Sequence, residues 1–196
     1  MSDKIDMGMS VLTAIRGRRS LRCYAPGKLE ENTVRILLDA AVQAPTAVHE
    51  EPWAFAVIQD LEILKRISDR VKAVSAEEAR KLHLEHGGNL PDRFADPDFN
   101  IFYNAGTLIV IYGKPPGKFV AADCWLAAEN LILAAYSMGL GTCVIGSAVE
   151  ALNSPETKAE LGISEKITAH VPIIVGVRSG VVTSSSRKAP DILIWK

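Results

Sequence analysis

The stretch GTLIVIYG, residues 106–113, decides the fold class, because it places an uncharged, mostly apolar run of six residues between two glycines. A short apolar run without polar alternation is typical of a strand that is buried on both of its faces. Such a strand belongs to the interior of a sheet that has helices on either side. We therefore expect residues 107–112 to form a central strand.

The segments on either side extend this picture. Residues 118–138 predict a long helix with small residues over much of its surface, and a helix that is apolar nearly all round is buried centrally or at a subunit interface. Before the central strand, residues 53–59 alternate and are rich in strand formers. An amphipathic helix is expected over 60–74, followed by a poorly regular segment over 76–104 that begins with a short polar helix.

The remaining elements give an α+β fold. Helices are expected before Gly17, over 30–44 and from the Ser154–Pro155 cap to Leu161. Strands are expected over 167–178 and 191–195. The chain therefore reads as one domain over 1–196, with three or four strands and helices on both faces. The last strand has no obvious hairpin partner, so it is available to pair with a second chain.

Composition excludes several classes of function. The 196 residues carry 22 Lys and Arg against 23 Asp and Glu, which argues against a nucleic-acid-binding protein. The longest apolar stretch, 121–138, contains Asp123, Glu129 and Asn130, so we expect no membrane span. The first ten residues lack the apolar core of a signal peptide. Three cysteines without a C-x-x-C spacing suit a reduced, cytoplasmic protein.

Four arginines gather between residues 16 and 22 of this nearly neutral chain. The segment 18–26 reads as extended, so Arg18, Ser20 and Arg22 are expected on one side, with Arg16 as a bystander on the preceding helix. Guanidinium groups and a hydroxyl suit one phosphorylated ligand. The alternative is a set of surface arginines at a helix end, where cations complement the helix dipole. A second basic pair lies at 187–188.

Other chemistries have little support in the sequence. His83 and His86 are spaced for one helix face, but two ligands without a third favour a solvated surface over a metal site. There is no G-x-S-x-G nucleophile elbow. The glycines of 139–146 follow a helix instead of a strand, the reverse of the order that a dinucleotide fold needs.

Four motifs in register resemble the FMN-dependent nitroreductase family. They are RRSLRCY (18–24), AAVQAPTAVHEEPWAFAVI (40–58), NLILAAYSMGLGTCVIG (130–146) and RKAPDILIW (187–195). The resemblance implies an α+β homodimer with FMN at the subunit interface, a mostly antiparallel central sheet, and a C-terminal strand exchanged between the two chains. The 118–138 helix then corresponds to the core of the dimer.

The same resemblance assigns candidate cofactor contacts by position. They are Arg18, Arg19, Ser20, Arg22, Pro45, Thr46, Ala47, His49, Ile145, Gly146, Arg187 and Lys188. It implies that Arg18, Ser20 and the 187–188 pair hold the phosphate and ribityl chain. Arg22 reaches the pyrimidine edge of the flavin and raises its reduction potential. The 45–49 turn contacts the flavin of the partner subunit, and the 145–146 backbone faces flavin N5.

Two positions depart from the family turn Pro-Ser-Ser-x-Asn-x-Gln-Pro-Trp. His49 stands for the Asn and Glu51 for the Gln. An imidazole at this position either alters the flavin contact and its pH response or makes the same hydrogen bond as Asn. In the loop expected to face the flavin, Ile145 occupies a position where some members of the family carry Glu. Because the expected contact with flavin N5 comes from the backbone, we expect this change of side chain to have little effect.

The activity that the resemblance implies is hydride transfer from NADH or NADPH through flavin N5 to an acceptor, by a ping-pong mechanism without a catalytic side chain. Nitroaromatics and quinones are the expected acceptors by analogy. A specialised reaction of the same fold (flavin destruction, dehalogenation or enone reduction) is an alternative, and so is a non-catalytic FMN-binding protein. The 76–104 segment is expected to cover the flavin and to set the choice of substrate.

Overall fold

The computed structural model describes residues 8–86, 94, 96–115, 117–180 and 186–196, and over 77–86 it describes the backbone alone. A four-stranded sheet forms the centre, in the order β1-β2-β4-β3. The strands are β1 (Trp53–Ile58), β2 (Thr107–Gly113), β3 (Leu140–Val144) and β4 (Thr168–Val177), and every neighbouring pair is antiparallel. The α+β class and the antiparallel sheet are confirmed.

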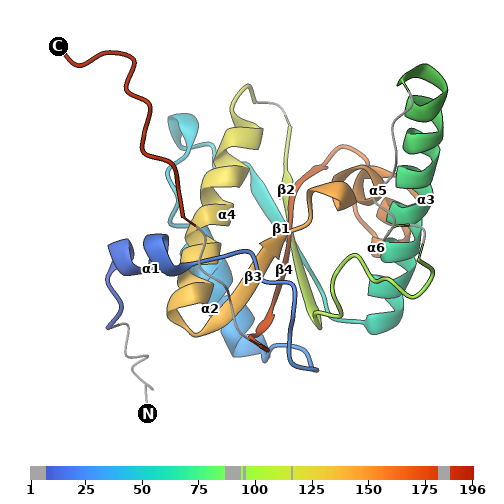
Figure 1. Cartoon of the computed structure of the whole chain (residues 1–196), viewed down its shortest axis with the longest axis horizontal. Helices are drawn as coiled ribbons and strands as arrows, with labels where there is room; N and C mark the ends of the chain where they lie inside the picture. Colours follow the sequence, from blue (N-terminus) through green and yellow to red (C-terminus); the bar gives the residue numbers. More distant parts are fainter. Residues whose placement is uncertain (1–7, 87–93, 95, 116, 181–185) are drawn as a thin grey trace.

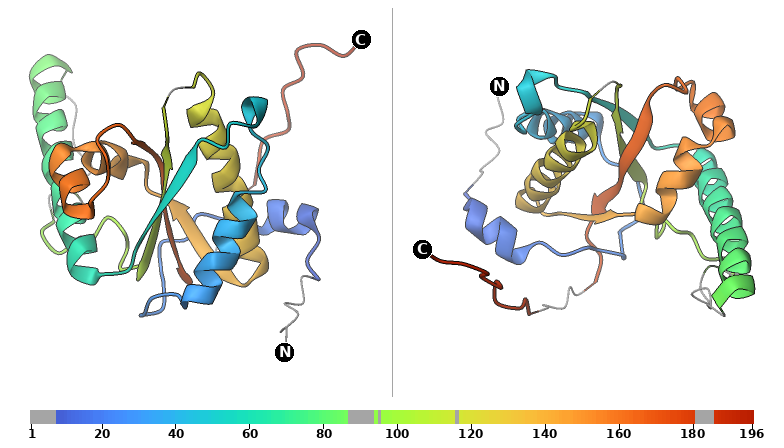
Figure 2. Two further views of the ribbon diagram at one scale, coloured as in Figure 1. Left: turned by 180° about the vertical axis from the view of Figure 1, so that it is seen from behind. Right: turned by 90° about the horizontal axis from the view of Figure 1, so that it is seen from above.

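Helices cover both faces of this sheet (Figures 1 and 2). On one side lie α1 (Val11–Gly17), α2 (Glu31–Ala41) and α4 (Val120–Ser137). On the other lie α3 (Leu61–His86), α5 (Val149–Asn153) and α6 (Pro155–Leu161). Short 3₁₀ turns, η1 (Ala47–His49) and η3 (Gly146–Ala148), precede β1 and α5.

The central strand is buried along its whole length, as its sequence predicts. Ile109 and Ile111 of β2 pack into the core beneath α2 and α4, whereas Leu108 and Val110 pack into the core beneath α3 and α5. All four side chains are fully buried. A strand that supplies both cores has no polar face, which explains the unbroken apolar run.

Several predicted helices occur close to their expected positions. In α6, the Ser154 hydroxyl caps the helix by accepting the Thr157 N–H at 3.2 Å, Pro155 follows in the first turn, and Gly162 ends the helix with a φ of 65°. Helix α2 ends at Ala41, three residues before its expected end. Helix α3 runs on to His86, beyond the expected 74, and so joins the amphipathic helix to the short polar helix that is expected at the start of 76–104.

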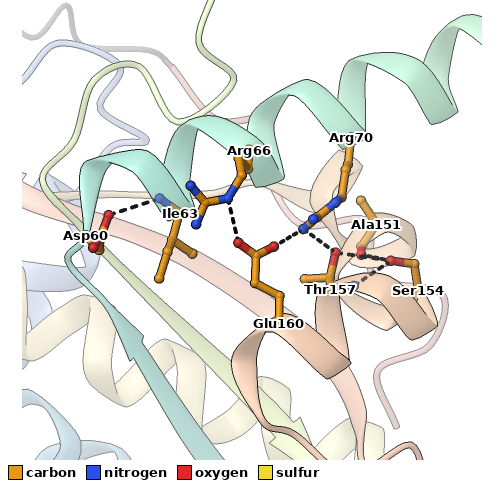
Figure 3. A network of polar contacts seen from close by, with 8 residues as sticks. All are labelled: Asp60, Ile63, Arg66, Arg70, Ala151, Ser154, Thr157 and Glu160. Atoms are coloured by element: carbon orange, nitrogen blue, oxygen red, sulfur yellow. Dashed lines mark hydrogen bonds and ion pairs between the residues drawn. The ribbon is translucent and has the colours of Figure 1, made fainter.

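A polar network fastens α3 to α6 (Figure 3). The Glu160 carboxylate accepts the Arg66 Nε–H at 2.6 Å and also bonds Arg70, whose guanidinium reaches Thr157 as well. At the start of α3, Asp60 accepts the Ile63 N–H at 3.1 Å. These contacts fix the helix layer that lies behind the segment 94–106.

One strand of the sheet was not expected, and the expected C-terminal strand, which was assigned to pairing with a second chain, stays a prediction. Residues 140–144 form β3, although their sequence gave no expectation of a strand there. Residues 191–195 form no strand within this chain. They belong to an extended tail, 186–196, that leaves the body of the molecule (Figures 1 and 2). Among the described residues, no helix is long and apolar enough to cross a membrane.

Candidate functional site

The arginine-rich segment runs along the β3 edge of the sheet. Ser20 forms a parallel bridge with Thr142, and Tyr24 forms an antiparallel bridge with Arg178 at the end of β4. The Leu21 N–H donates to the Thr142 carbonyl at 2.8 Å. Gly141 permits this approach, since a Cβ at that position would lie 2.2 Å from the Leu21 side chain. The segment 18–24 is therefore extended, as expected, and is held to the sheet.

A hollow of about 300 Å³ lies beside this segment, and we call it the arginine hollow. Its charged lining residues are Arg16, Arg18, Arg19 and Arg178, and no acidic residue from the described part of the chain lines it. Arg16, expected to be a bystander, is thus part of the site. Four guanidinium groups without a lining carboxylate favour an anionic ligand, and phosphate suits their bidentate geometry.

Backbone carbonyls hold two of these arginines in place. Arg178 donates from Nε to the Leu140 carbonyl at 2.8 Å and from Nη2 to the Tyr136 carbonyl at 3.0 Å, with its guanidinium 4.3 Å from the Tyr136 ring centroid. Arg19 donates to the carbonyls of Arg16 and Arg18, each at 2.7 Å. Sequence analysis did not single out Arg178, whose only signal was a basic residue directly after an apolar strand.

Arg18 is held differently, by an acidic side chain from α4. Its Nε donates to Glu129 Oε1 at 3.2 Å. The Glu129 side chain is 49% exposed, so solvent screens this ion pair and it adds little stability. A phosphate at Arg18 would meet this carboxylate, and sequence analysis did not foresee that contact.

A second hollow of about 120 Å³ lies beside the same segment, and we call it the aromatic hollow. Three of the predicted residues, Arg22, Ile145 and Gly146, line it together. Its aromatic lining residues are Phe94, Phe99 and Tyr103. Arg18 and Arg22 line different hollows, and Arg19 joins Arg18, because the segment is pinned by isolated bridges instead of following a regular strand. Ser20 and Arg22 both reach Cys143, whereas Arg18 pairs with Glu129, so the expected common face is wrong for Arg18 alone.

The aromatic side chains form a connected wall. The rings of Phe94 and Phe99 meet edge to face at 5.9 Å, and those of Phe99 and Tyr103 at 5.6 Å. The Arg22 guanidinium lies 5.8 Å from the Tyr103 ring centroid, within the range of a cation–π contact. Phe94 and three residues of 99–103 therefore border three predicted site residues, and the role of this segment as a cover stays a prediction.

Among the described lining residues of the aromatic hollow, Arg22 carries the single charged side chain. Burial raises the pKa of the neighbouring Cys143 thiol, although the Arg22 charge and a Ser20 hydrogen bond oppose that shift. Burial likewise raises the pKa of Tyr24, whose hydroxyl donates to the Leu21 carbonyl at 2.6 Å. Both groups stay neutral at physiological pH, so the positive charge of Arg22 is not offset there.

The two backbone donors predicted for the flavin ring differ in availability. The Ile145 N–H donates to the Pro172 carbonyl at 2.9 Å. The Gly146 N–H begins the η3 turn and has no acceptor among the described residues. Of the pair, Gly146 is therefore the one with a donor to offer a ligand.

The turn 45–51 lies elsewhere, beside the N-terminal end of α4, whereas the arginine hollow includes Tyr136 near the C-terminal end of that helix (Figure 1). Within one chain the structure does not bring Pro45, Thr46, Ala47 or His49 to either hollow. Three turn residues have left-handed backbone angles: Val48 (φ 49°), His49 (φ 57°) and Glu51 (φ 44°). Such conformations cost about 1–3 kcal/mol each for residues other than glycine.

The basic pair 187–188 is also separate. Arg187 and Lys188 are exposed on the tail, and neither is among the lining residues of the two hollows. Within the described residues, no group of three or more potential metal ligands lies together. The side chains of His83 and His86 lie outside the described part of the chain.

A third hollow, of about 550 Å³, is a weaker candidate. It lies between α3 and the segment 97–106 and shares Phe99 with the aromatic hollow. Two of its lysines, Lys65 and Lys72, pair with Asp69, at 2.8 Å and 3.2 Å. Its charges therefore largely satisfy one another, unlike those of the arginine hollow.

The chain is similar in sequence and in fold to proteins of one family. A sequence profile of the Nitroreductase family matches residues 15–176. A putative NADH dehydrogenase/NAD(P)H nitroreductase of Archaeoglobus fulgidus is 29% identical over 170 residues, covering 84% of this chain and 83% of that protein. One of the same name from Methanothermobacter thermautotrophicus is 33% identical over 143 residues, covering 70% and 61%. The crystal structure of a nitroreductase with bound FMN from Bacteroides fragilis superimposes with a TM-score of 0.82 at 27% identity, covering 96% of this chain and all of that one.

Proposed function

Because this chain belongs to the Nitroreductase family, we propose that it is an FMN-dependent oxidoreductase that takes electrons from NADH or NADPH. The observation that carries this proposal is the pair of hollows along the segment 18–24. One is lined by four arginines and the other by three aromatic rings and a single arginine. FMN combines a phosphate with a flat aromatic ring, so both ends of the cofactor find suitable chemistry along one segment.

The residues present fit FMN. Arg18 offers a guanidinium to the phosphate, and Ser20 adds a hydroxyl from the same segment. Arg22 places an unopposed positive charge in the aromatic hollow, where it favours added negative charge on the ring and raises the reduction potential. The open Gly146 N–H offers a hydrogen bond to a ring nitrogen.

When bound, FMN supplies a ring nitrogen, N5, that accepts hydride from the donor and passes it to the acceptor. The contribution of the chain is to position and to exclude water. Phe94, Phe99 and Tyr103 provide an apolar wall for a donor or acceptor ring. No side chain is required as a general acid, so the proposed site lacks a catalytic residue in that sense.

We infer a ping-pong order, with nitroaromatics or quinones as acceptors. In this order the donor reduces the flavin and leaves before the acceptor binds over the same ring. Steady-state rates at several fixed acceptor concentrations should then give parallel double-reciprocal lines. Intersecting lines would contradict this order.

The functional unit is a homodimer with FMN at the interface. Large apolar side chains are exposed on α1, on α4 and on the tail; Leu12, Trp125, Leu193 and Trp195 are each at least half exposed. Exposed apolar surface on this scale is typical of an interaction site. In a dimer the turn 45–51 and the basic pair 187–188, which lie apart from the hollows of their own chain, become available to the partner.

The decisive experiment is anaerobic mixing of the FMN-loaded protein with NADH and, separately, with NADPH. A reductase loses the yellow absorbance of oxidised flavin with at least one donor, and an added quinone or nitroaromatic compound restores it. Failure of both donors to reduce bound FMN would refute the reductase and favour a non-catalytic FMN-binding protein. Failure to bind FMN at all would refute both functions.

A further inference from the structure

The turn 45–51 makes little hydrogen-bond contact with the rest of the described chain. Among the described residues, a single hydrogen bond joins this turn to another part of the chain, from the Ala47 N–H to Asp123 Oδ1 at 3.2 Å. The neighbouring Glu50 N–H returns to the Ala47 carbonyl within the turn itself. Because Val48, His49 and Glu51 have unfavourable backbone angles, the turn depends on outside contacts to keep its shape.

Asp123 is an unusual residue in its position. It lies in the first turn of α4, a mostly apolar helix, and is only 3% exposed. No cation pairs with it among the described residues, and its second oxygen, Oδ2, is buried without a hydrogen-bond partner there. The Asp123 carboxylate does lie at the N-terminal end of α4, where the helix dipole stabilises a negative charge.

A carboxylate that is buried with one oxygen unsatisfied is a poor choice for the stability of this chain. A residue that destabilises the fold at its own position is expected to have a functional role. The residue that Asp123 holds, Ala47, lies in the turn that the family resemblance brings to the flavin of the partner subunit.

We propose that Asp123 is a positioning residue, which holds the turn 45–51 in the shape that completes the FMN site of the partner subunit. This inference rests on the proposed function. It predicts that Asp123 contributes to cofactor affinity without contributing to the stability of the apoprotein, a separation that a residue of purely structural importance would not show.

Two substitutions test this. Asp123→Ala removes the acceptor of the Ala47 N–H, and the dissociation constant for FMN should rise at least about tenfold, the equivalent of one lost hydrogen bond. Asp123→Asn keeps an oxygen acceptor and should restore affinity to within about threefold of the native chain. The control is Asp39→Ala, which removes an exposed carboxylate from α2 and should leave FMN affinity unchanged.

Thermal unfolding of the apoproteins supplies the second readout. The Asp123→Ala apoprotein should melt at or above the temperature of the native apoprotein. If its affinity for FMN is unchanged, the inference is wrong. It is also wrong if the loss of affinity comes with a lower melting temperature, because the residue then acts through stability alone. Binding of FMN by the native chain tests the proposed function separately.

Mixed dimers test the placement in the partner's site. One chain carries Asp123→Ala and the other Arg18→Ala, with two different affinity tags for purification. If the turn serves the partner, one of the two sites combines a native Arg18 with a native turn, and the mixed dimer should bind about half of the native FMN content. If the turn serves its own chain, both sites are defective, and a mixed dimer without FMN would overturn the proposal.

Discussion

Arg18 meets Glu129 where the proposed function would put a phosphate. In the chain alone the carboxylate neutralises this guanidinium at 3.2 Å, which keeps Arg18 ordered before a ligand arrives. A phosphate at the same guanidinium lies close to a second negative charge. Glu129 therefore supports the arginine and opposes its ligand at the same time.

Glu129→Gln should for this reason tighten FMN binding by about threefold, because exposed charge pairs are worth up to about 1 kcal/mol. Isothermal titration of the apoprotein with FMN measures the effect, and raising the salt concentration should reduce it. Glu150→Gln, an exposed glutamate on α5, is the matched control. Weaker binding by the Glu129 variant would show that the carboxylate mainly orders Arg18.

The double substitution Arg18→Ala with Arg187→Ala tests the phosphate assignment itself. It removes two of the cations proposed to hold the phosphate, so the purified protein should lose most of its FMN while its far-UV circular dichroism stays native. Arg35→Ala with Lys166→Ala is the control, since Arg35 pairs with Glu31 in its own helix and Lys166 is exposed away from both hollows. A double variant that purifies fully yellow would refute the assignment.

At this scale the sequence predicts the identity of many site residues but not their grouping. The motif around Arg22 and the motif around Gly146 lie far apart in the chain, and the structure brings them into one hollow. Alternation failed for Arg18 because a segment held by two isolated bridges need not keep a strand's regular geometry. Asp123 and Glu129 gave no signal as site residues, since a helix pattern marks them only as polar positions.

The helix layer of α3 and α6 depends on one carboxylate between two arginines (Figure 3). The Arg66 and Arg70 guanidinium groups hold the pKa of Glu160 below its ordinary value of 4.5. A lowered pKa in the folded state means that the ionised carboxylate stabilises the fold above the unfolded-state pKa. That contribution is lost as the pH falls through the folded-state value.

Glu160→Gln should accordingly lower the free energy of unfolding by about 1 kcal/mol at neutral pH, with little difference from the native chain in acid. Urea unfolding at neutral pH and again well below 4.5 measures this contrast. Glu165→Gln, an exposed residue between α6 and β4, is the control. An equal loss at both pH values would assign the effect to packing and not to charge.

Among the elements, prediction succeeded where one signal dominates. The apolar run of β2 and the Ser154–Pro155 cap of α6 each identify their element directly. Strand β3 was missed because Gly141 weakens its strand pattern, and that glycine is needed for the close approach of Leu21. The contact with Leu21 requires a glycine at position 141, and a glycine weakens the strand propensity of the segment.

The tail concerns the molecule as a whole. Leu193 is 93% exposed and Trp195 is 87% exposed, so neither side chain has a place in the core of its own chain. In the proposed homodimer the strand 191–195 adds to the partner's sheet. A single chain cannot reveal this, because the groups that would order the tail belong to a second copy.

Deletion of residues 191–196 should weaken the dimer. Burial of a large apolar side chain is worth about 2 kcal/mol, so losing two of them raises the dimer dissociation constant roughly a hundredfold or more. Size-exclusion chromatography with light scattering over a dilution series measures it, and removal of Lys196 alone is the control. A native chain that is already monomeric at micromolar concentration would contradict the interface site.

The bridges of the segment 18–24 also have a consequence for how the protein is made. Ser20 pairs with Thr142 and Tyr24 with Arg178, so the segment that leaves the ribosome early is fastened to the two strands that leave it late. Such distant pairings slow folding, because the intervening chain must be ordered first. During synthesis the segment 18–24 therefore cannot pair with the sheet until β3 and β4 have left the ribosome, and its arginines stay exposed until then. A nascent chain can neither retain cofactor nor turn over substrate before its final strand is complete.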